Sequence, residues 1–155
     1  MKVFDQEFAR EMLSRLESMP EDARPQWGAM TRGQLIGHLA SMLRYTAGEG
    51  PEIPFKGNFK SRTVFKFLIL SGIKPIPHNV RLPRPAEIPK EAWFKEESIT
   101  QLREAVDAYF AMAAENALPT RIHPFFGPLT GRQWQRMHRI HAIHHLTQFG
   151  IAGGL

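Results

Sequence analysis

Hydrophobic side chains recur every three or four positions along much of the chain, which is the spacing of helices that bury one face. In residues 5–18 this spacing is kept by Phe8, Met12 and Leu16. Pro20 follows and is incompatible with a continuing helix interior. The pattern therefore predicts a first amphipathic helix over residues 5–18.

Capping boxes indicate where three further helices begin. In this motif a serine or threonine and a glutamine three residues later satisfy each other's free backbone amides. The predicted helices cover residues 31–45, 98–116 and 130–149, and their boxes pair Thr31 with Gln34, Ser98 with Gln101, and Thr130 with Gln133. An all-α fold follows from these signals.

A shorter helix is predicted over residues 61–70, which are nearly apolar on all sides and are therefore expected to lie centrally. The apolar run from Val64 to Ile73 is shorter than the roughly 20 residues needed to cross a bilayer. We expect no membrane partner. The following stretch contains five prolines, which exclude a helix or a central strand and predict a long surface connection, with a lid over a site as one role open to it: Pro75, Pro77, Pro83, Pro85 and Pro89.

Composition narrows the class of protein. A chain of 155 residues with 43% hydrophobic and 23% charged residues is typical of one globular domain, here residues 1–155. The lack of cysteine excludes disulfides, thiolate metal ligands and a cysteine nucleophile, so a metal would rest on histidine and carboxylate. The first residues lack the apolar stretch of a signal peptide, and we expect a cytoplasmic location.

The formal net charge of +5 favours anionic partners. Lys56, Lys60, Arg62 and Lys66 lie close together in the sequence, but other basic residues are scattered. No aromatic ladder, zinc finger or arginine-rich arm accompanies them, which argues against nucleic-acid binding. A solvated face with a mild basic bias, or an anionic small molecule, fits these residues better.

The clearest chemical signal is a histidine cluster near the C-terminus. Four of the seven histidines fall within residues 137–145. His141 and His145 are one helical turn apart and face the same way, so both rings can reach one metal ion. His144 is turned away from that face and is expected to be outside the ligand set.

A tight site needs a third ligand, and His38 is the candidate. It lies on a core-forming helix, where an unpaired imidazole would cost desolvation free energy. His138, one turn before His141, is an alternative ligand or lines the pocket. Each histidine also has a simpler interpretation as a hydrogen-bonded core residue, and a histidine-rich helix can be a solvated surface.

Three further side chains are candidates to line the pocket or to orient its ligands. Gln34 and Tyr45 lie toward the His38 side of their helix, and Gln148 lies one turn beyond His145. The alternatives are that Gln34 serves only the capping box, that Tyr45 is a core residue, and that Gln148 hydrogen-bonds locally. Three imidazoles would leave an open coordination position, as in catalytic zinc sites. We expect one divalent transition metal per chain, with zinc or nickel preferred by imidazole ligands. No carboxylate is placed to act as general base.

Two segments, residues 27–39 (WGAMTRGQLIGHL) and residues 123–150 (from HPFFGPLTGRQW to HAIHHLTQFG), carry a family resemblance. They are similar to the first and last metal-ligand helices of the DinB-like (DinB/YfiT) metalloenzyme superfamily, and to a bacterial branch of it whose function is unknown. The resemblance implies a four-helix bundle, with an additional short helix or a long proline-rich connection. It places His38, His141 and His145 around the metal.

Some members of that superfamily are thiol-dependent transferases or isomerases. Others have no known activity, so the resemblance supports the metal more strongly than any reaction. An open position on a metal could activate a bound thiol or water, and we therefore expect a metal-dependent transferase or hydrolase. Its substrate would be a low-molecular-weight thiol, as in those relatives, or an anionic compound, as the net charge favours. A metal-containing binding or stress protein without turnover is the alternative. We also expect a homodimer, because Ile140, Ile143 and Leu146 lie away from the histidine face of the last helix and need to be covered. Packing within the bundle is the alternative way to cover them.

Overall fold

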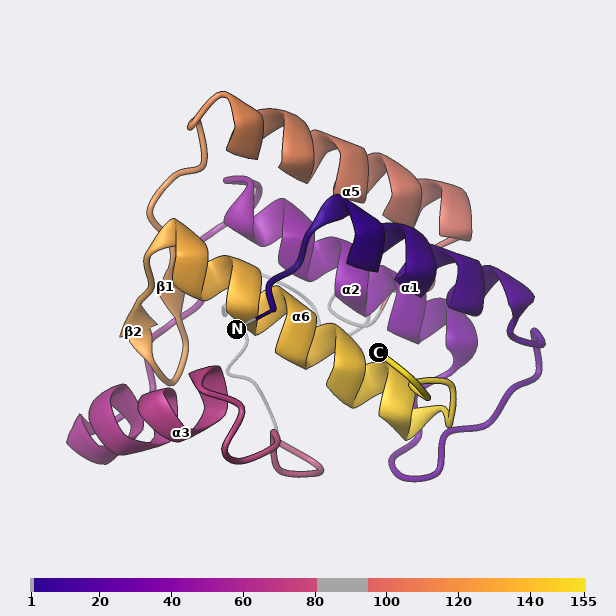
Figure 1. The fold of residues 1–155 in the computed structure, drawn as a ribbon, viewed down its shortest axis with the longest axis horizontal. Coiled ribbons are helices and arrows are strands. Elements are labelled where there is room, and N and C mark those ends of the chain that lie inside the picture. Colours follow the sequence, from indigo (N-terminus) through magenta and orange to yellow (C-terminus); the bar gives the residue numbers. More distant parts are fainter. Residues whose placement is uncertain (1, 81–94) are drawn as a thin grey trace.

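The computed structural model describes residues 2–80 and 95–155 and is mostly helical, as predicted (Figure 1). A two-stranded antiparallel hairpin is its only sheet within these residues. The elements are α1 (Gln6–Ser18), α2 (Arg32–Thr46), the π-helical turn η1 (Ser61–Phe65), α3 (Lys66–Leu70), α5 (Ile99–Ala114), β1 (Ile122–His123), β2 (Gly127–Pro128) and α6 (Gly131–Gln148).

All three capping boxes form as the sequence predicts. The side chains of Thr31, Ser98 and Thr130 each accept the amide of the glutamine three residues on, and each glutamine side chain accepts in return. Asp5 caps α1 by accepting the Phe8 amide at 2.8 Å. These local bonds fix where the long helices start, because they satisfy amides that have no partner within the helix.

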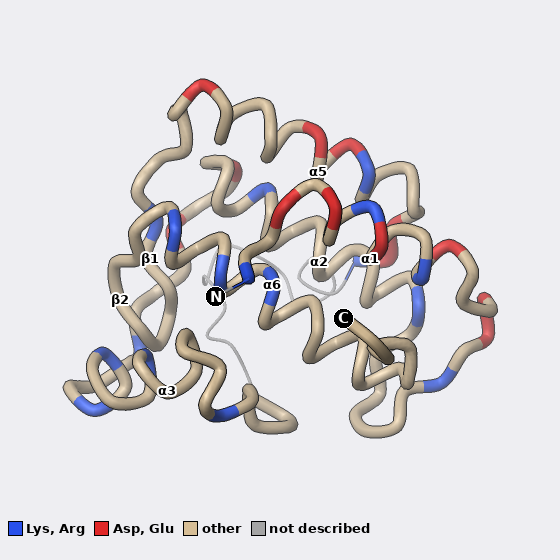
Figure 2. The backbone as a smooth tube through the Cα atoms, in the orientation of Figure 1, with Lys and Arg blue, Asp and Glu red and all other residues tan. Residues whose placement is uncertain are grey.

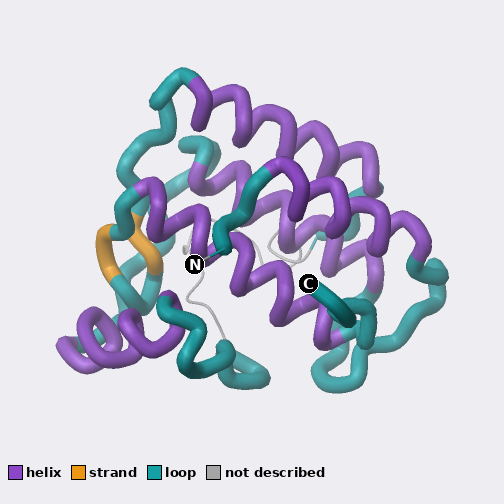
Figure 3. Tube along the Cα trace, viewed as in Figure 1, coloured by secondary structure: helices purple, strands orange, loops and turns teal. Residues whose placement is uncertain are grey.

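One hydrophobic core joins the four long helices of the described chain. Helix α2 packs on α5 and α6, and α1 packs on α5 and α6 (Figures 1 and 3). Fully buried residues from every one of these helices meet there, among them Leu16, Leu35, Leu102 and Leu146. A smaller second core around Trp134 connects α3 and the hairpin to the start of α6.

The prediction that residues 61–70 lie centrally is wrong. Only Ile69 and Leu70 of α3 are buried, whereas Val64, Phe65 and Phe67 are exposed. The segment lies at the edge of the molecule below the hairpin (Figure 1), so just one end of it reaches the second core. A run of apolar residues without helical periodicity does not predict which side of the helix is buried against the protein.

The apolar residues of α6 that face away from the histidines are covered within the chain. Leu146 is fully buried in the main core, Ile143 packs against that core, and Ile140 packs against the second core. Packing within the chain, the alternative to a partner subunit, therefore accounts for these three residues, and they give the homodimer no support. The homodimer itself stays a prediction.

The proline-rich connection falls partly on Pro83, Pro85 and Pro89, which lie outside the described residues. Pro75 and Pro77 follow α3 in irregular chain, as expected. No helix of the described chain is long and apolar enough to cross a membrane.

Candidate metal centre

The structure brings His38, His141 and His145 together. Their candidate ligand nitrogens all lie within 4.8 Å of one another. The Nε2 atom of His141 is 2.9 Å from Nε2 of His38 and 3.1 Å from Nε2 of His145. No other group of three histidine, aspartate or glutamate side chains in residues 2–80 and 95–155 converges in this way.

Packing of two helices creates this arrangement. His141 and His145 lie on successive turns of α6 and on the same face of that helix. Helix α2 carries His38 and packs against α6. Next to His38, Gly37 lies so close to the chain before α5 that a Cβ atom would be 2.1 Å from the Lys95 carbonyl oxygen. Gly37 therefore permits close approach of this segment to α2.

Burial keeps the three imidazoles neutral. Desolvation, followed by the nearby His145, lowers the pKa of His38 to about 3. Desolvation also lowers the pKa of His145 to about 4 and that of His141 well below its usual value. A neutral imidazole carries the lone pair that binds a metal, so the ligand form predominates at neutral pH.

Gln148 determines which nitrogen of His145 carries the proton. The Gln148 side-chain amide donates to the backbone carbonyl of Trp27 at 2.8 Å, which can only accept. The other end of the amide, Oε1, therefore faces Nδ1 of His145 at 2.8 Å and accepts from it. With the proton on Nδ1, the Nε2 lone pair of His145 points toward the other two histidines. Gln148 thus lies where a residue that orients a metal ligand is usually found.

The remaining two histidines of the cluster lie elsewhere. The Nε2 atom of His138 is 2.9 Å from the Thr46 hydroxyl, and its ring stacks near Trp134. His138 therefore belongs to the core and is not among the converging ligands. His144 is half-buried and packs edge-on to Trp27 and His145.

Gln34 and Tyr45, both predicted near the metal, have other partners. The Gln34 side-chain oxygen accepts the Thr31 amide in the capping box of α2. The Tyr45 hydroxyl lies 2.8 Å from both a Glu52 carboxylate oxygen and the Ile122 carbonyl oxygen. Tyr45 therefore joins α2 to the hairpin, and its contacts give it no part in the site.

The loop histidines have structural positions. His123 is buried, and its Nδ1 atom accepts the amides of Phe125 and Phe126 within the hairpin turn. His78 stacks on Trp27 with ring centroids 3.9 Å apart. Trp27, which begins the first segment of the family resemblance, is a neighbour of the site that no sequence signal singled out.

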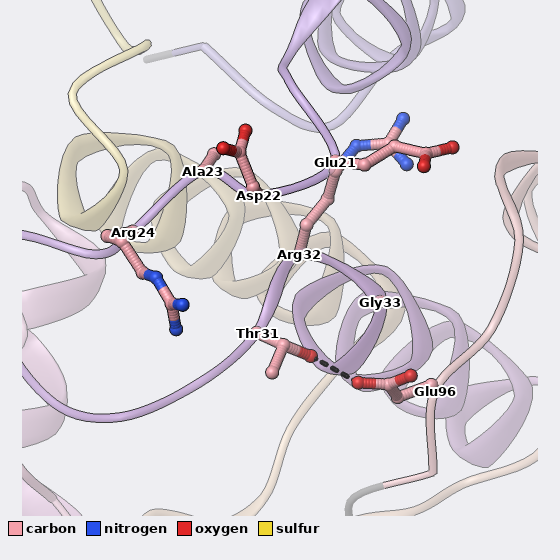
Figure 4. A pocket seen from close by; sticks show the side chains of 8 residues that line it. All are labelled: Glu21, Asp22, Ala23, Arg24, Thr31, Arg32, Gly33 and Glu96. Atoms are coloured by element: carbon pink, nitrogen blue, oxygen red, sulfur yellow. Dashed lines mark hydrogen bonds between the residues drawn. The ribbon is translucent and has the colours of Figure 1, made fainter.

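A hollow of about 400 Å³ lies at the start of α2, away from the convergent nitrogens. Figure 4 shows Thr31 donating to Glu96 across it, at 2.6 Å. Its walls carry both signs of charge and none of the seven histidines: Glu21, Asp22, Ala23, Arg24, Thr31, Arg32, Gly33 and Glu96. The residues that could hold a metal ion are therefore the three histidines, and they lie outside this hollow.

Fold and site together define a mostly helical protein in which three histidines from two helices can hold a metal ion. The chain belongs to a family described as "Protein of unknown function (DUF1569)", whose model matches residues 5–151. No curated protein and no solved structure matches it.

Proposed function

We propose that this chain is a DinB-like four-helix bundle that holds one divalent transition metal on His38, His141 and His145. The packing of α1, α2, α5 and α6 around one core supports the bundle. The main support for a metal site is the convergence of the three imidazoles. The two sequence segments similar to DinB-like proteins contain all three residues.

Two of the three separations between the nitrogens, and the protonation of His145, fit a metal, and the whole set lies within 4.8 Å. Zinc–nitrogen bonds of about 2.0–2.1 Å at tetrahedral angles separate ligand nitrogens by about 3.3 Å. The two separations of 2.9 and 3.1 Å around His141 are close to that value. A cation would also be bound by the Nε2 lone pair of His145 that Gln148 directs toward the centre. Imidazole ligands favour zinc or nickel.

The proposed function is metal-dependent catalysis of a transferase or hydrolase type, in a cytoplasmic setting. Three protein ligands leave a coordination position open, as in catalytic zinc sites. A divalent metal there acts as a Lewis acid and lowers the pKa of a coordinated water or thiol. The chain's own contribution is to supply three neutral imidazoles, to fix the His145 tautomer through Gln148, and to bury the ligands.

One observation favours a second candidate, a metal-containing binding or stress protein without turnover. Among the described residues, no carboxylate hydrogen-bonds to His38, His141 or His145. A hydrolase usually needs a group placed to move protons. The described residues show no such group bound to the three histidines.

A turnover screen separates the two candidates. Zinc- and nickel-loaded protein would be assayed with low-molecular-weight thiols plus electrophilic acceptors, and separately with simple esters. The proposal expects turnover that requires metal and is absent in His145→Ala. Metal binding without turnover in the whole screen would favour the binding protein. Equal turnover in His145→Ala would contradict catalysis at this site.

A further inference from the structure

An exposed apolar surface lies on the segment from Phe55 to Val80, outside the candidate metal centre. Every large hydrophobic side chain that is exposed in the described residues comes from this segment. They are Phe55, Phe59, Val64, Phe65, Phe67, Ile73 and Val80. Phe59 and Phe67 are the most open, at 80% and 64% exposed. Exposed apolar residues that gather in this way mark interaction sites, whereas single ones are common on any protein surface.

The same segment carries the net charge of the protein. Residues 53–80 contain five basic residues and no acidic one: Lys56, Lys60, Arg62, Lys66 and Lys74. The other 15 basic residues of the chain are balanced by its 15 acidic residues, so the formal charge of +5 belongs to this segment alone. Figure 2 shows Lys and Arg without Asp or Glu on α3, whereas acidic residues gather along α1 and α5.

The segment is held to the body of the protein by its inner side. Ile69 and Leu70 are buried, the Ser61 hydroxyl donates to the Phe125 carbonyl at 2.7 Å, and Lys66 donates to the Pro128 carbonyl at 3.0 Å. Residues 59–70 form one continuous helical rod through η1 into α3. Phe59, Val64, Phe65 and Phe67 therefore project from an anchored element at the edge of the molecule (Figure 1), and Phe55, Ile73 and Val80 lie in the chain on either side of it.

Four of the basic side chains are exposed and remain available for an anionic partner, namely Lys56, Lys60, Arg62 and Lys74, whereas Lys66 is held by the Pro128 carbonyl. No carboxylate of the described chain lies within 4.0 Å of a charged nitrogen of these five residues. The Arg62 guanidinium lies 5.7 Å from the centre of the Phe55 ring, so charged and aromatic groups are side by side. Protein surfaces that bind at a membrane interface combine lysine and arginine with exposed aromatic and aliphatic side chains, as this segment does.

We propose that residues 55–80 dock on an anionic lipid bilayer. The phenylalanine and aliphatic side chains would enter the boundary between headgroups and acyl chains, while the four exposed basic residues contact lipid phosphates. A second copy of this chain is a poor partner for the surface, because two such surfaces facing each other would bring like charges together. Nucleic acid matches the charge but offers nothing to Val64, Ile73 and Val80. This proposal replaces the expectation of no membrane partner, which rested on the lack of a spanning segment. Peripheral binding needs no spanning helix, so the finding that none of the described helices could cross a bilayer is compatible with it.

Flotation of the full-length chain with vesicles tests the proposal. The probes are phosphatidylcholine alone and phosphatidylcholine with about 30% phosphatidylglycerol, at about 0.1 M and 0.5 M salt. The chain should float with the anionic vesicles at low salt and stay behind with neutral vesicles or at high salt. Each basic residue at an anionic surface strengthens binding about fivefold.

Matched variants locate the surface. Lys56→Glu with Lys60→Glu should weaken flotation at least about tenfold, since both charges are reversed. Arg10→Glu with Arg132→Glu makes the same change in net charge at exposed positions elsewhere and should keep most of the binding. Phe59→Gln with Phe67→Gln tests the apolar contribution and should also weaken binding. Unchanged circular dichroism would show that each variant is folded.

Several outcomes would overturn the proposal. They are absence of flotation at low salt, equal binding to neutral vesicles, and equal losses in the two charge-reversal pairs. Binding of a short DNA duplex with the same dependence on salt and on Lys56 and Lys60, without vesicle binding, would assign the surface to nucleic acid. Capture of an acidic polypeptide under the same conditions would likewise assign it to a protein partner.

Discussion

Helical phase divides the histidines near the C-terminus into different environments. His141 and His145 share one face of α6 and converge with His38, whereas His144, between them in sequence, packs against Trp27. His138 is bound to Thr46 in the core. Neighbouring residues of the same type therefore have different expected roles, and single substitutions can distinguish them.

His145→Ala should abolish tight metal binding, while His144→Ala should leave most of it. His145 contributes one of three converging nitrogens, and two remaining imidazoles hold a metal only weakly. His38→Ala should resemble His145→Ala. Calorimetric titration of the three variants with zinc and nickel measures this directly. Equal losses from His144→Ala and His145→Ala would show that the assigned ligand register is wrong.

Gln148 should tune the metal through His145 without binding it. Gln148→Leu removes the acceptor for Nδ1–H of His145, and loss of such a partner typically weakens metal affinity by about 10- to 100-fold. Gln148→Glu keeps an acceptor and should retain more affinity than Gln148→Leu. Thr147→Ala, at the exposed neighbouring position, is the control for helix stability. Indistinguishable zinc affinities for wild type and Gln148→Leu would refute this role.

At the scale of elements, Gly37 is where α2 meets the chain before α5. Gly37→Ala would place a methyl group 2.1 Å from the Lys95 carbonyl oxygen, so one of the two backbones must move. We expect a loss of roughly 1–3 kcal/mol in the free energy of unfolding, as for other overpacked sites. Urea denaturation measures it.

Gly131→Ala is the matched control, because nothing lies within 4 Å of its added Cβ atom. Alanine there, in the first turn of α6, should be neutral or stabilising by up to about 1 kcal/mol. A Gly37→Ala protein as stable as the Gly131→Ala protein would contradict the close packing at Lys95.

Local sequence signals predicted where the helices begin, but not which of their faces are buried against the rest of the protein. Capping boxes fix helix starts through bonds between residues three apart, so the starts of α2, α5 and α6 were predictable. Spacing also placed His141 and His145 on one face. The edge position of α3 and the contacts of Tyr45 depend on the hairpin, which joins elements far apart in sequence. No periodicity reports such contacts, so the position of residues 61–70 was predicted wrongly and the hydrogen-bond partners of Tyr45 could not be predicted.

At the scale of the whole molecule, several buried neutral histidines make stability depend on pH. Burial lowers the pKa of His123 and His138 to about 3, whereas an unfolded histidine titrates near 6.5. Above pH 6.5 both states are neutral, and below it only the unfolded state takes up protons. The free energy of unfolding should therefore fall as pH falls from 6.5, by roughly 1.4 kcal/mol per pH unit for each such histidine.

Denaturant unfolding of chelator-treated protein between pH 7.5 and about 5 checks this dependence, in a window where most carboxylates stay ionised. Metal-loaded protein should lose additional stability in acid, because protons compete with the metal for the imidazoles. A free energy of unfolding that stays constant or rises as pH falls from 6.5 to 5 would contradict the buried neutral state of these residues.

The central claim is that three histidines form one metal site, and the metal content of the protein tests it most directly. Protein purified without a histidine tag would be examined by elemental analysis and then titrated with zinc and nickel at neutral pH. We predict about one divalent transition metal per chain, either as purified or after reconstitution, and none held tightly by His145→Ala. Absence of metal as purified, followed by no uptake on reconstitution, would contradict the account.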